Sequence, residues 1–179
     1  QLTSAARPAT FEVEAFNERG EMVPTSIAGG HALTLYLDKR ELVTLMTLGH
    51  APEALAIGFL RNQRLVATVE HIKAVQVDWE TESVAITTTK KSDIEKKTRR
   101  KTVTTGCGQG TVYGDLMEEI DAVKLRDDVS LADADLFALI EKVRRHETIY
   151  KQAGAVHGCA LATRDGEILM FVEDVGRHN

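Results

Sequence analysis

The clearest fold signal in this chain is Val156-His-Gly-Cys-Ala-Leu-Ala-Thr163, then Arg164-Asp-Gly-Glu167, then Ile168-Leu-Met-Phe-Val172. Two runs of small and apolar residues flank Asp165-Gly166, and an Asp-Gly pair in that setting is a strong signal for a hairpin turn. We therefore predict an antiparallel β-hairpin over residues 156–172. Because residues 168–172 are apolar throughout, we expect the return strand to be buried.

Seven residues, Glu173-Asp-Val-Gly-Arg-His-Asn179, follow the return strand directly. Charged groups clustered at the end of an apolar strand indicate a ligand site, because α/β folds bind ligands there. The Arg177 guanidinium suits phosphate, and the Glu173 and Asp174 carboxylates suit N–H donors such as those of guanine. The alternative is a solvated loop with surface ion pairs.

His157 and Cys159 lie two residues apart, so a strand places both on one face, where they could line a pocket. The alternative is a core strand, in which Cys159 packs and His157 hydrogen-bonds to backbone. We favour the packed position for Cys159, and both alternatives stay open for His157.

Upstream of residue 90 the chain has the pattern of a small α+β unit. Residues 11–49 read as β structure with turns near residues 17–20 and 38–41, and residues 72–89 read as a further hairpin. Pro52 suits the first turn of a helix over about 52–63. In the second half, a short helix is predicted from Asp115. A longer one is capped by Ser130 and buries an apolar face. That face carries Leu136, Leu139, Ile140 and Val143.

The stretch from Lys90 to Lys101 holds seven basic and two acidic residues, in a chain whose net charge is −5. We interpret it as a connection between domains. The predicted organisation is an N-terminal α+β domain over residues 1–100, with this basic linker at its end. A second, α/β domain begins at residue 101 and continues to residue 179.

Composition excludes several classes of protein. The 179 residues are 43% hydrophobic, and the sequence pI is about 5.7, which argues against a nucleic-acid binder. No run approaches the roughly 18 apolar residues of a membrane span. The first residues lack the apolar core of a signal peptide, so we expect a cytoplasmic protein. Its two cysteines are then thiols.

Cys107 lies between glycines in Gly106-Cys-Gly-Gln-Gly110. A glycine-rich loop just ahead of a predicted helix exposes backbone N–H groups, which favour a thiolate, a persulfide or a phosphate. A thiolate there has a depressed pKa and is reactive. The alternative is a small buried thiol in a turn. The loop is no P-loop, because no Lys-Ser/Thr follows, and Gly110 replaces the second cysteine of a Cys-x-x-Cys pair.

Four segments together resemble one family, the formate dehydrogenase accessory sulfurtransferases, FdhD/NarQ. They are Val23-Pro-Thr-Ser-Ile-Ala28, Leu33-Thr-Leu-Tyr-Leu-Asp38, Thr104-Thr-Gly-Cys-Gly108 and Glu173–Asn179. The resemblance covers essentially the whole chain. It implies a sulfur carrier that accepts sulfane sulfur from a cysteine desulfurase as a Cys107 persulfide. The sulfur would pass to the molybdenum of a bis(molybdopterin guanine dinucleotide) cofactor destined for formate dehydrogenase.

The resemblance also implies a fold and a binding site. The second domain would be a cytidine-deaminase-like three-layer α/β domain, truncated at its C-terminus, in a homodimer without nucleic-acid or membrane partners. Cys107 would be the catalytic residue, and the guanine dinucleotide would lie near the cysteine loop and the last seven residues. The predicted cofactor-binding residues are Thr105, Gly106, Gly108, His157, Glu173, Asp174, Gly176, Arg177, His178 and Asn179.

Two departures from related sequences matter. Many relatives carry Cys-x-x-Cys in the loop, whereas this chain has only the first cysteine. The chain also lacks the helical continuation and the C-terminal stretch that such proteins normally have, so we assign no cofactor contacts there. In addition, Gly176-Arg-His-Asn179 stands where a deaminase has its zinc ligand and catalytic Glu, so we predict no zinc. The alternatives are a binding chaperone for the cofactor, in which Cys107 only shapes the loop, and a zinc deaminase, which the missing ligands disfavour.

Overall fold

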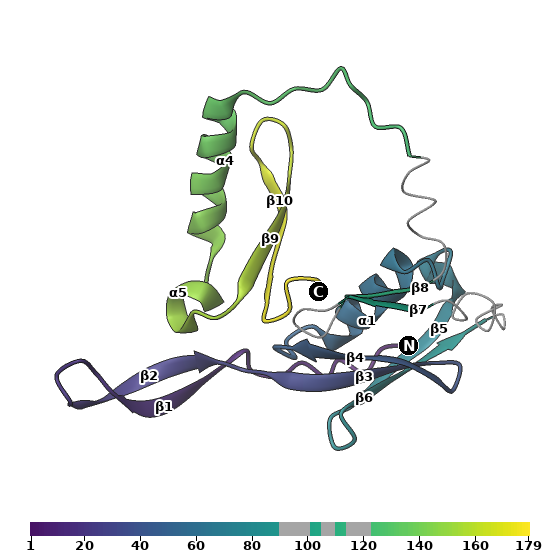
Figure 1. The fold of residues 1–179 in the computed structure, drawn as a ribbon. Coiled ribbons are helices and arrows are strands. Elements are labelled where there is room, and N and C mark those ends of the chain that lie inside the picture. The colour runs from purple at the N-terminus through teal and green to yellow at the C-terminus, as the bar shows by residue number, and fades with distance from the viewer. Residues whose placement is uncertain (90–100, 105–109, 114–122) are drawn as a thin grey trace.

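The computed structural model describes residues 1–89, 101–104, 110–113 and 123–179. Figure 1 shows a sheet with a helix packed on it, a long two-stranded arm, and a separate helix-and-hairpin unit. The N-terminal elements are β1 (Thr10–Phe16), β2 (Met22–Ala28), β3 (His31–Leu37), β4 (Arg40–Thr47), α1 (Pro52–Asn62), a 3₁₀ turn (Val69–His71), β5 (Ile72–Asp78) and β6 (Ser83–Thr88). The later elements are β7 (Lys101–Thr104), β8 (Gly110–Tyr113), α4 (Asp133–His146), α5 (Ile149–Ala153), β9 (His157–Ala162) and β10 (Ile168–Asp174).

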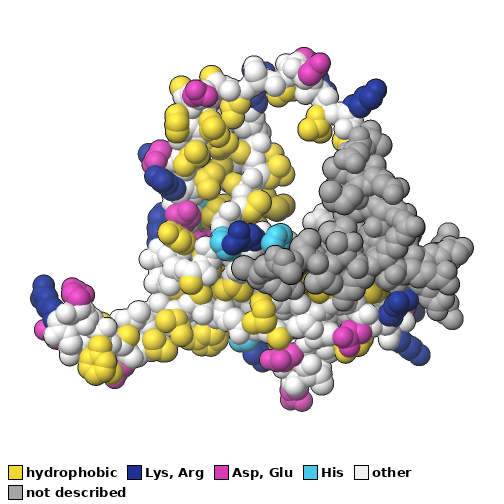
Figure 2. Space-filling view, viewed as in Figure 1, with side chains coloured by type: hydrophobic (Ala, Val, Ile, Leu, Met, Phe, Trp, Pro, Cys, Tyr) yellow, Lys and Arg dark blue, Asp and Glu magenta, His cyan; other side chains and the backbone are white. Residues whose placement is uncertain are grey.

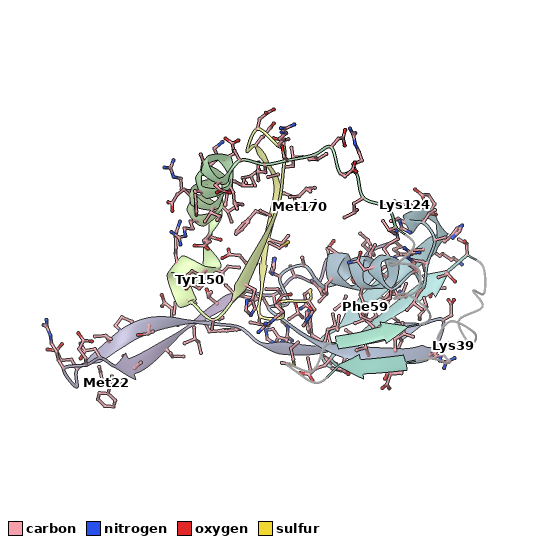
Figure 3. All side chains as sticks on the ribbon, turned by 45° about the horizontal axis from the view of Figure 1, so that its top comes forward. Met22, Lys39, Phe59, Lys124, Tyr150 and Met170 are labelled. Carbon is pink, nitrogen blue, oxygen red and sulfur yellow. The ribbon has the colours of Figure 1, made fainter. Side chains whose placement is uncertain are left out.

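The central sheet has the strand order β4-β3-β6-β5. Two antiparallel hairpins, β3–β4 and β5–β6, meet through the parallel pair β3–β6. Alternate residues of β3 point to one face, which is why Leu33, Leu35 and Leu37 are all fully buried there. Helix α1 covers this face with Ala56 and Leu60, and Phe59 lies on α1 beside the sheet (Figure 3).

Most of the predictions for this half are confirmed. The helix predicted over about 52–63 is α1, and the hairpin over 72–89 is β5–β6. The turn predicted at residues 38–41 is tighter, because Asp38 and Lys39 both take positive φ and β4 begins at Arg40. The Asp38 carboxylate accepts hydrogen bonds from the Thr88 N–H (2.9 Å) and hydroxyl (2.6 Å), which ties this turn to the end of β6.

Strands β1 and β2 form an antiparallel arm that extends away from the sheet (Figure 1). Met22 lies at its far end, and Tyr150 lies where α5 meets the base of the arm (Figure 3). Helix α5 packs against β2. The helix-and-hairpin unit therefore contacts the N-terminal half through α5.

The sequence-based prediction for the long helix is wrong in two respects. Helix α4 begins at Asp133, and its N-cap position, Ala132, makes no side-chain cap, so Ser130 is not the cap. No residue of α4 is buried, and Leu136 is 43% exposed. The apolar stripe predicts an amphipathic helix correctly. Among the described elements, however, the narrow β9–β10 hairpin lies beside α4 (Figure 1), and its two strands do not cover that stripe.

The hairpin β9–β10 is confirmed, and Gly166 takes φ +78° in its turn. The expectation that the return strand is buried is wrong, because Leu169 and Met170 are 58% and 60% exposed. Two strands alone have two faces to cover, and Figure 2 shows apolar side chains gathered openly over α4 and the hairpin. The helix predicted from Asp115 and most of the basic stretch 90–101 lie outside the described residues.

Candidate functional site

The terminal segment, residues 173–179, returns from β10 to the end of β4. Asp174 makes this connection. Its Oδ2 accepts the Thr47 hydroxyl (2.8 Å), and its Oδ1 accepts the Leu48 N–H (2.7 Å). Oδ2 also accepts the Asn179 side-chain amide (3.0 Å), and Oδ1 also accepts the Val175 N–H (2.7 Å). One carboxylate therefore joins two parts of the chain about 126 residues apart.

Asn179 makes a second attachment to the same strand. Its side-chain amide donates to the Met46 carbonyl (2.8 Å), and its backbone N–H donates to the Gly176 carbonyl (3.0 Å), which closes a turn. Residues 176–178 are thus bracketed by two anchored positions. Sequence reasoning missed Thr47 and Leu48. The only local signal there is a threonine at a strand end followed by Gly49.

Glu173 is 4% exposed, and its carboxylate binds the N-terminal end of α5. Its carboxylate accepts the N–H groups of Thr148, Ile149 and Tyr150 at 2.9–3.0 Å, together with the Thr148 hydroxyl at 2.9 Å. Burial by itself raises the pKa of this carboxyl, but the hydrogen bonds outweigh burial and hold the pKa below the usual 4.5. Glu173 is therefore a helix cap supplied from another element, because α5 has no side-chain cap of its own.

The structure separates the predicted ligand residues into two groups. Glu173 and Asp174 are occupied by partners within the chain, so neither carboxylate is free for a guanine. Arg177 and His178 are exposed and make no hydrogen bond or ion pair with another described residue. Of the predicted residues in this segment, these two have side chains available to a ligand.

His157 lies opposite Asp174 in the β9–β10 register, so the structure brings it to the terminal segment. Its side chain is exposed. Cys159 is an exposed free thiol opposite Val172. The prediction that Cys159 packs in a core is therefore wrong, for the same reason that β10 is open to solvent.

The predicted residues Thr105, Gly106, Cys107 and Gly108 lie outside the described residues. The flanking strands β7 and β8 pair antiparallel, with Thr104 opposite Gly110, so the cysteine loop connects the two strands of a hairpin. The loop is not placed directly ahead of a helix, because β8 intervenes. Cys107 therefore does not directly precede a helix N-terminus, and glycine-rich backbone is the feature of its segment that favours an anion.

A second cluster adjoins the Thr47–Leu48 end of β4. The Arg7 backbone N–H donates to the Gly49 carbonyl (2.8 Å), and the Arg7 guanidinium lies 4.7 Å from the Trp79 ring centroid. His31 Nδ1 lies 3.4 Å from Arg7 Nη1. Burial and the nearby Arg7 charge lower the pKa of His31, although Glu82 opposes the change. A neutral ring accepts from Arg7, and this holds the N-terminal segment against the β4–α1 turn.

We expect Gly49→Ala to destabilise the protein by about 2–4 kcal/mol in urea denaturation. Gly49 has φ +77°, and an added Cβ would lie 3.1–3.2 Å from the His31 and Trp79 rings. The matched control is Gly20→Ala, with φ +75° and open space around it, which should cost about 1 kcal/mol. Equal losses for the two variants would show that ring crowding contributes nothing.

Among the described residues, no three His, Cys, Asp or Glu side chains are grouped as a metal site, and no helix has the length and apolar character of a membrane span. The absence of zinc remains a prediction from the sequence. A cavity between α4 and the β9–β10 turn, about 350 Å³, is lined by Lys142, Arg164 and Asp165 among others. None of the predicted site residues that the structure describes lines it.

The model of the FdhD/NarQ family matches residues 29–179. The chain belongs to the FdhD/NarQ family. This confirms the family resemblance seen in the four sequence segments. Two FdhD relatives, both named sulfur carrier protein FdhD, come from Shouchella clausii and Listeria innocua. The first is 32% identical over 86% of this chain, and the second 28% identical over 99%.

A solved structure has a similar fold. The crystal structure of a candidate formate dehydrogenase accessory protein from Desulfotalea psychrophila covers 96% of this chain with a TM-score of 0.64, at 20% identity. The present fold, mixed α/β with several small sheets and few helices, matches it. The chain spans 58% and 67% of the two curated relatives' lengths and 64% of the solved chain.

Proposed function

We propose that this FdhD/NarQ chain is a sulfurtransferase that carries sulfur on Cys107 to the molybdenum cofactor of formate dehydrogenase. One observation carries the proposal: a single cysteine stands between glycines, in a loop joining two paired strands, in a family whose curated members are named sulfur carrier proteins. Glycine has no side chain that could crowd a neighbouring sulfur, and a glycine-rich backbone can present N–H groups to an anion.

Sulfur uptake on Cys107 balances without any external redox agent. The Cys107 thiolate attacks the outer sulfur of a persulfide on the donor, a cysteine desulfurase. A new S–S bond forms as the donor's S–S bond breaks, and the donor cysteine leaves as a thiolate. The transferred sulfur keeps its oxidation state. Loop N–H groups then stabilise the negative charge on the terminal sulfur of the Cys107 persulfide.

The cargo is the bis(molybdopterin guanine dinucleotide) cofactor, which receives the sulfur as a substrate. Its phosphates suit the exposed Arg177 and His178 at the turn held by Asp174 and Asn179. His157 lies beside this turn, opposite Asp174. In this proposal the cysteine loop, with Thr105, Gly106 and Gly108, faces the same ligand. Gly176 belongs to this turn through its carbonyl, which accepts the Asn179 N–H (3.0 Å).

Further parts of the proposal concern architecture and assembly. Residues 101–179 begin a cytidine-deaminase-like α/β domain that follows an N-terminal domain over residues 1–100, and the active protein is a homodimer. The antiparallel β9–β10 hairpin beside α4 is compatible with the start of such a domain. Analytical ultracentrifugation tests the dimer.

The deciding experiment is mass spectrometry after incubation with a cysteine desulfurase and cysteine. We expect an adduct of about 32 Da, one sulfur atom, on the peptide that contains Cys107. The matched control is Cys159→Ser, which removes the exposed second thiol and should retain the adduct. Cofactor binding without any adduct on Cys107 would instead support a binding chaperone that performs no sulfur chemistry.

A further inference from the structure

We propose that Asp174 is a positioning residue that fixes Arg177 and His178 at the end of β4 for a phosphate-bearing ligand. This inference rests on the proposed function, in which those two side chains bind the phosphates of the cargo. It assigns Asp174 a different role from the one its sequence predicts. The carboxylate acts through its neighbours and does not itself contact the ligand.

The hydrogen bonds of Asp174 carry this inference. Each carboxylate oxygen accepts one donor from the β4–α1 turn and one from the terminal segment: Leu48 and Val175 on Oδ1, Thr47 and Asn179 on Oδ2. A carboxylate offers about four lone-pair sites, so these four donors occupy its capacity. The carboxylate has no site left for a guanine N–H.

The anchors lie on both sides of Arg177 and His178. Asp174 holds the segment before Arg177, and Asn179 holds it after His178 through Met46 and Asp174. The Asn179 N–H to Gly176 carbonyl bond closes the intervening turn. A backbone fixed at both ends loses less entropy when its side chains bind a ligand, so anchoring strengthens phosphate binding.

Thr47 allows this coupling to be tested at a distance from the ligand. It is 2% exposed, and its hydroxyl donates to Asp174 and accepts the Gly49 N–H (3.2 Å). Valine has the shape of threonine without the hydroxyl, and serine keeps the hydroxyl. Thr44, on the exposed face of the same strand, bonds Thr34 and provides the matched Thr→Val control.

The test measures the affinity of the protein for guanosine monophosphate by calorimetry. We expect Thr47→Val to weaken binding about tenfold, because one charge-assisted hydrogen bond of the anchor is lost. Thr47→Ser should restore binding to within about twofold of the unsubstituted protein. Thr44→Val should leave it unchanged. Equal affinity of Thr47→Val and the unsubstituted protein would overturn the inference.

A double-mutant cycle separates positioning from general destabilisation. If Thr47 acts through Arg177, adding Thr47→Val to Arg177→Ala should weaken binding little beyond Arg177→Ala alone. Full additivity of the two losses would contradict positioning. Thermal denaturation of each variant shows that binding is compared between folded proteins.

Failure of the proposed function is distinguishable from failure of this inference. If the unsubstituted protein binds no guanosine monophosphate, the cargo proposal fails, and amide hydrogen exchange then decides the positioning role. In Thr47→Val the Val175 and Asn179 amides should exchange at least about tenfold faster, since their hydrogen bonds depend on the anchored segment. Unchanged exchange rates at both amides would refute it.

Discussion

Cys107→Ala is expected to abolish the sulfur adduct and, in cells that depend on this protein, to reduce formate dehydrogenase activity to background. The reason is chemical, since alanine has no atom that can attack a persulfide sulfur. Serine at this position keeps the size of the side chain but is a far weaker nucleophile, so Cys107→Ser should fail equally. Mass spectrometry of the purified variants and assay of the dehydrogenase in a complemented strain provide the two measurements.

The controls separate sulfur chemistry from folding. Circular dichroism and guanosine monophosphate affinity should be the same in Cys107→Ala and the unsubstituted protein, because Cys107 is not among the residues proposed to hold the ligand's phosphates. Cys159→Ser should retain both the adduct and the activity. A Cys107→Ala strain with full formate dehydrogenase activity would contradict the sulfur-carrier proposal.

Glu173→Ala is expected to lower the free energy of unfolding by about 3 kcal/mol. The substitution leaves three backbone N–H groups at the start of α5 and the Thr148 hydroxyl without their acceptor. Urea denaturation measures the loss. The matched control is Glu141→Gln, which removes a solvent-exposed ion pair with Arg144 and should change stability by less than about 0.5 kcal/mol. Similar losses for both variants would refute the capping role.

The same carboxylate makes stability depend on pH. Its pKa is lowered in the folded protein, so the unfolded chain binds more protons as the pH falls through 4.5. The stabilisation from Glu173 is therefore complete above the unfolded pKa and is lost as the pH falls through the lower, folded pKa. Glu173→Gln should flatten the plot of unfolding free energy against pH in this acidic range. An unchanged slope would exclude the lowered pKa.

Many of the strands, turns and helices of the N-terminal half could be predicted, because the sequence signals for them lie within a few neighbouring residues. Alternation in β3, Pro52 at the start of α1 and the hairpin turns each act over a few residues. In the second half the structure differs at Ser130, because the helix begins two residues later than a Ser130 cap indicates. A capping residue is a preference and not a requirement, and Ala132 takes the N-cap position.

The sequence predicts a ligand site in the terminal segment, and the structure gives two of its residues roles that the sequence does not indicate. A cluster of polar groups after an apolar strand marks the terminal segment. However, nothing near Glu173 in the sequence shows that its partners begin at Thr148. Two of the four partners of Asp174, Thr47 and Leu48, lie in the first third of the chain. From the sequence alone, both carboxylates are therefore predicted to bind a ligand. The tertiary structure shows instead that they accept hydrogen bonds from within the chain. The prediction that β10 is buried is wrong for a similar reason, because the composition of a strand does not show which element covers it.

The location of the hydrophobic core sets an order of assembly during translation. Every residue of the core cluster lies between Leu33 and Ile86, and the parallel pairing of β3 with β6 needs only residues up to Thr88. The sheet can thus form on the ribosome while the second half is still being synthesised. Thr47 and Leu48 are then already in place when Asp174 leaves the ribosome. The terminal segment can therefore bind to donors that the folded sheet has already positioned.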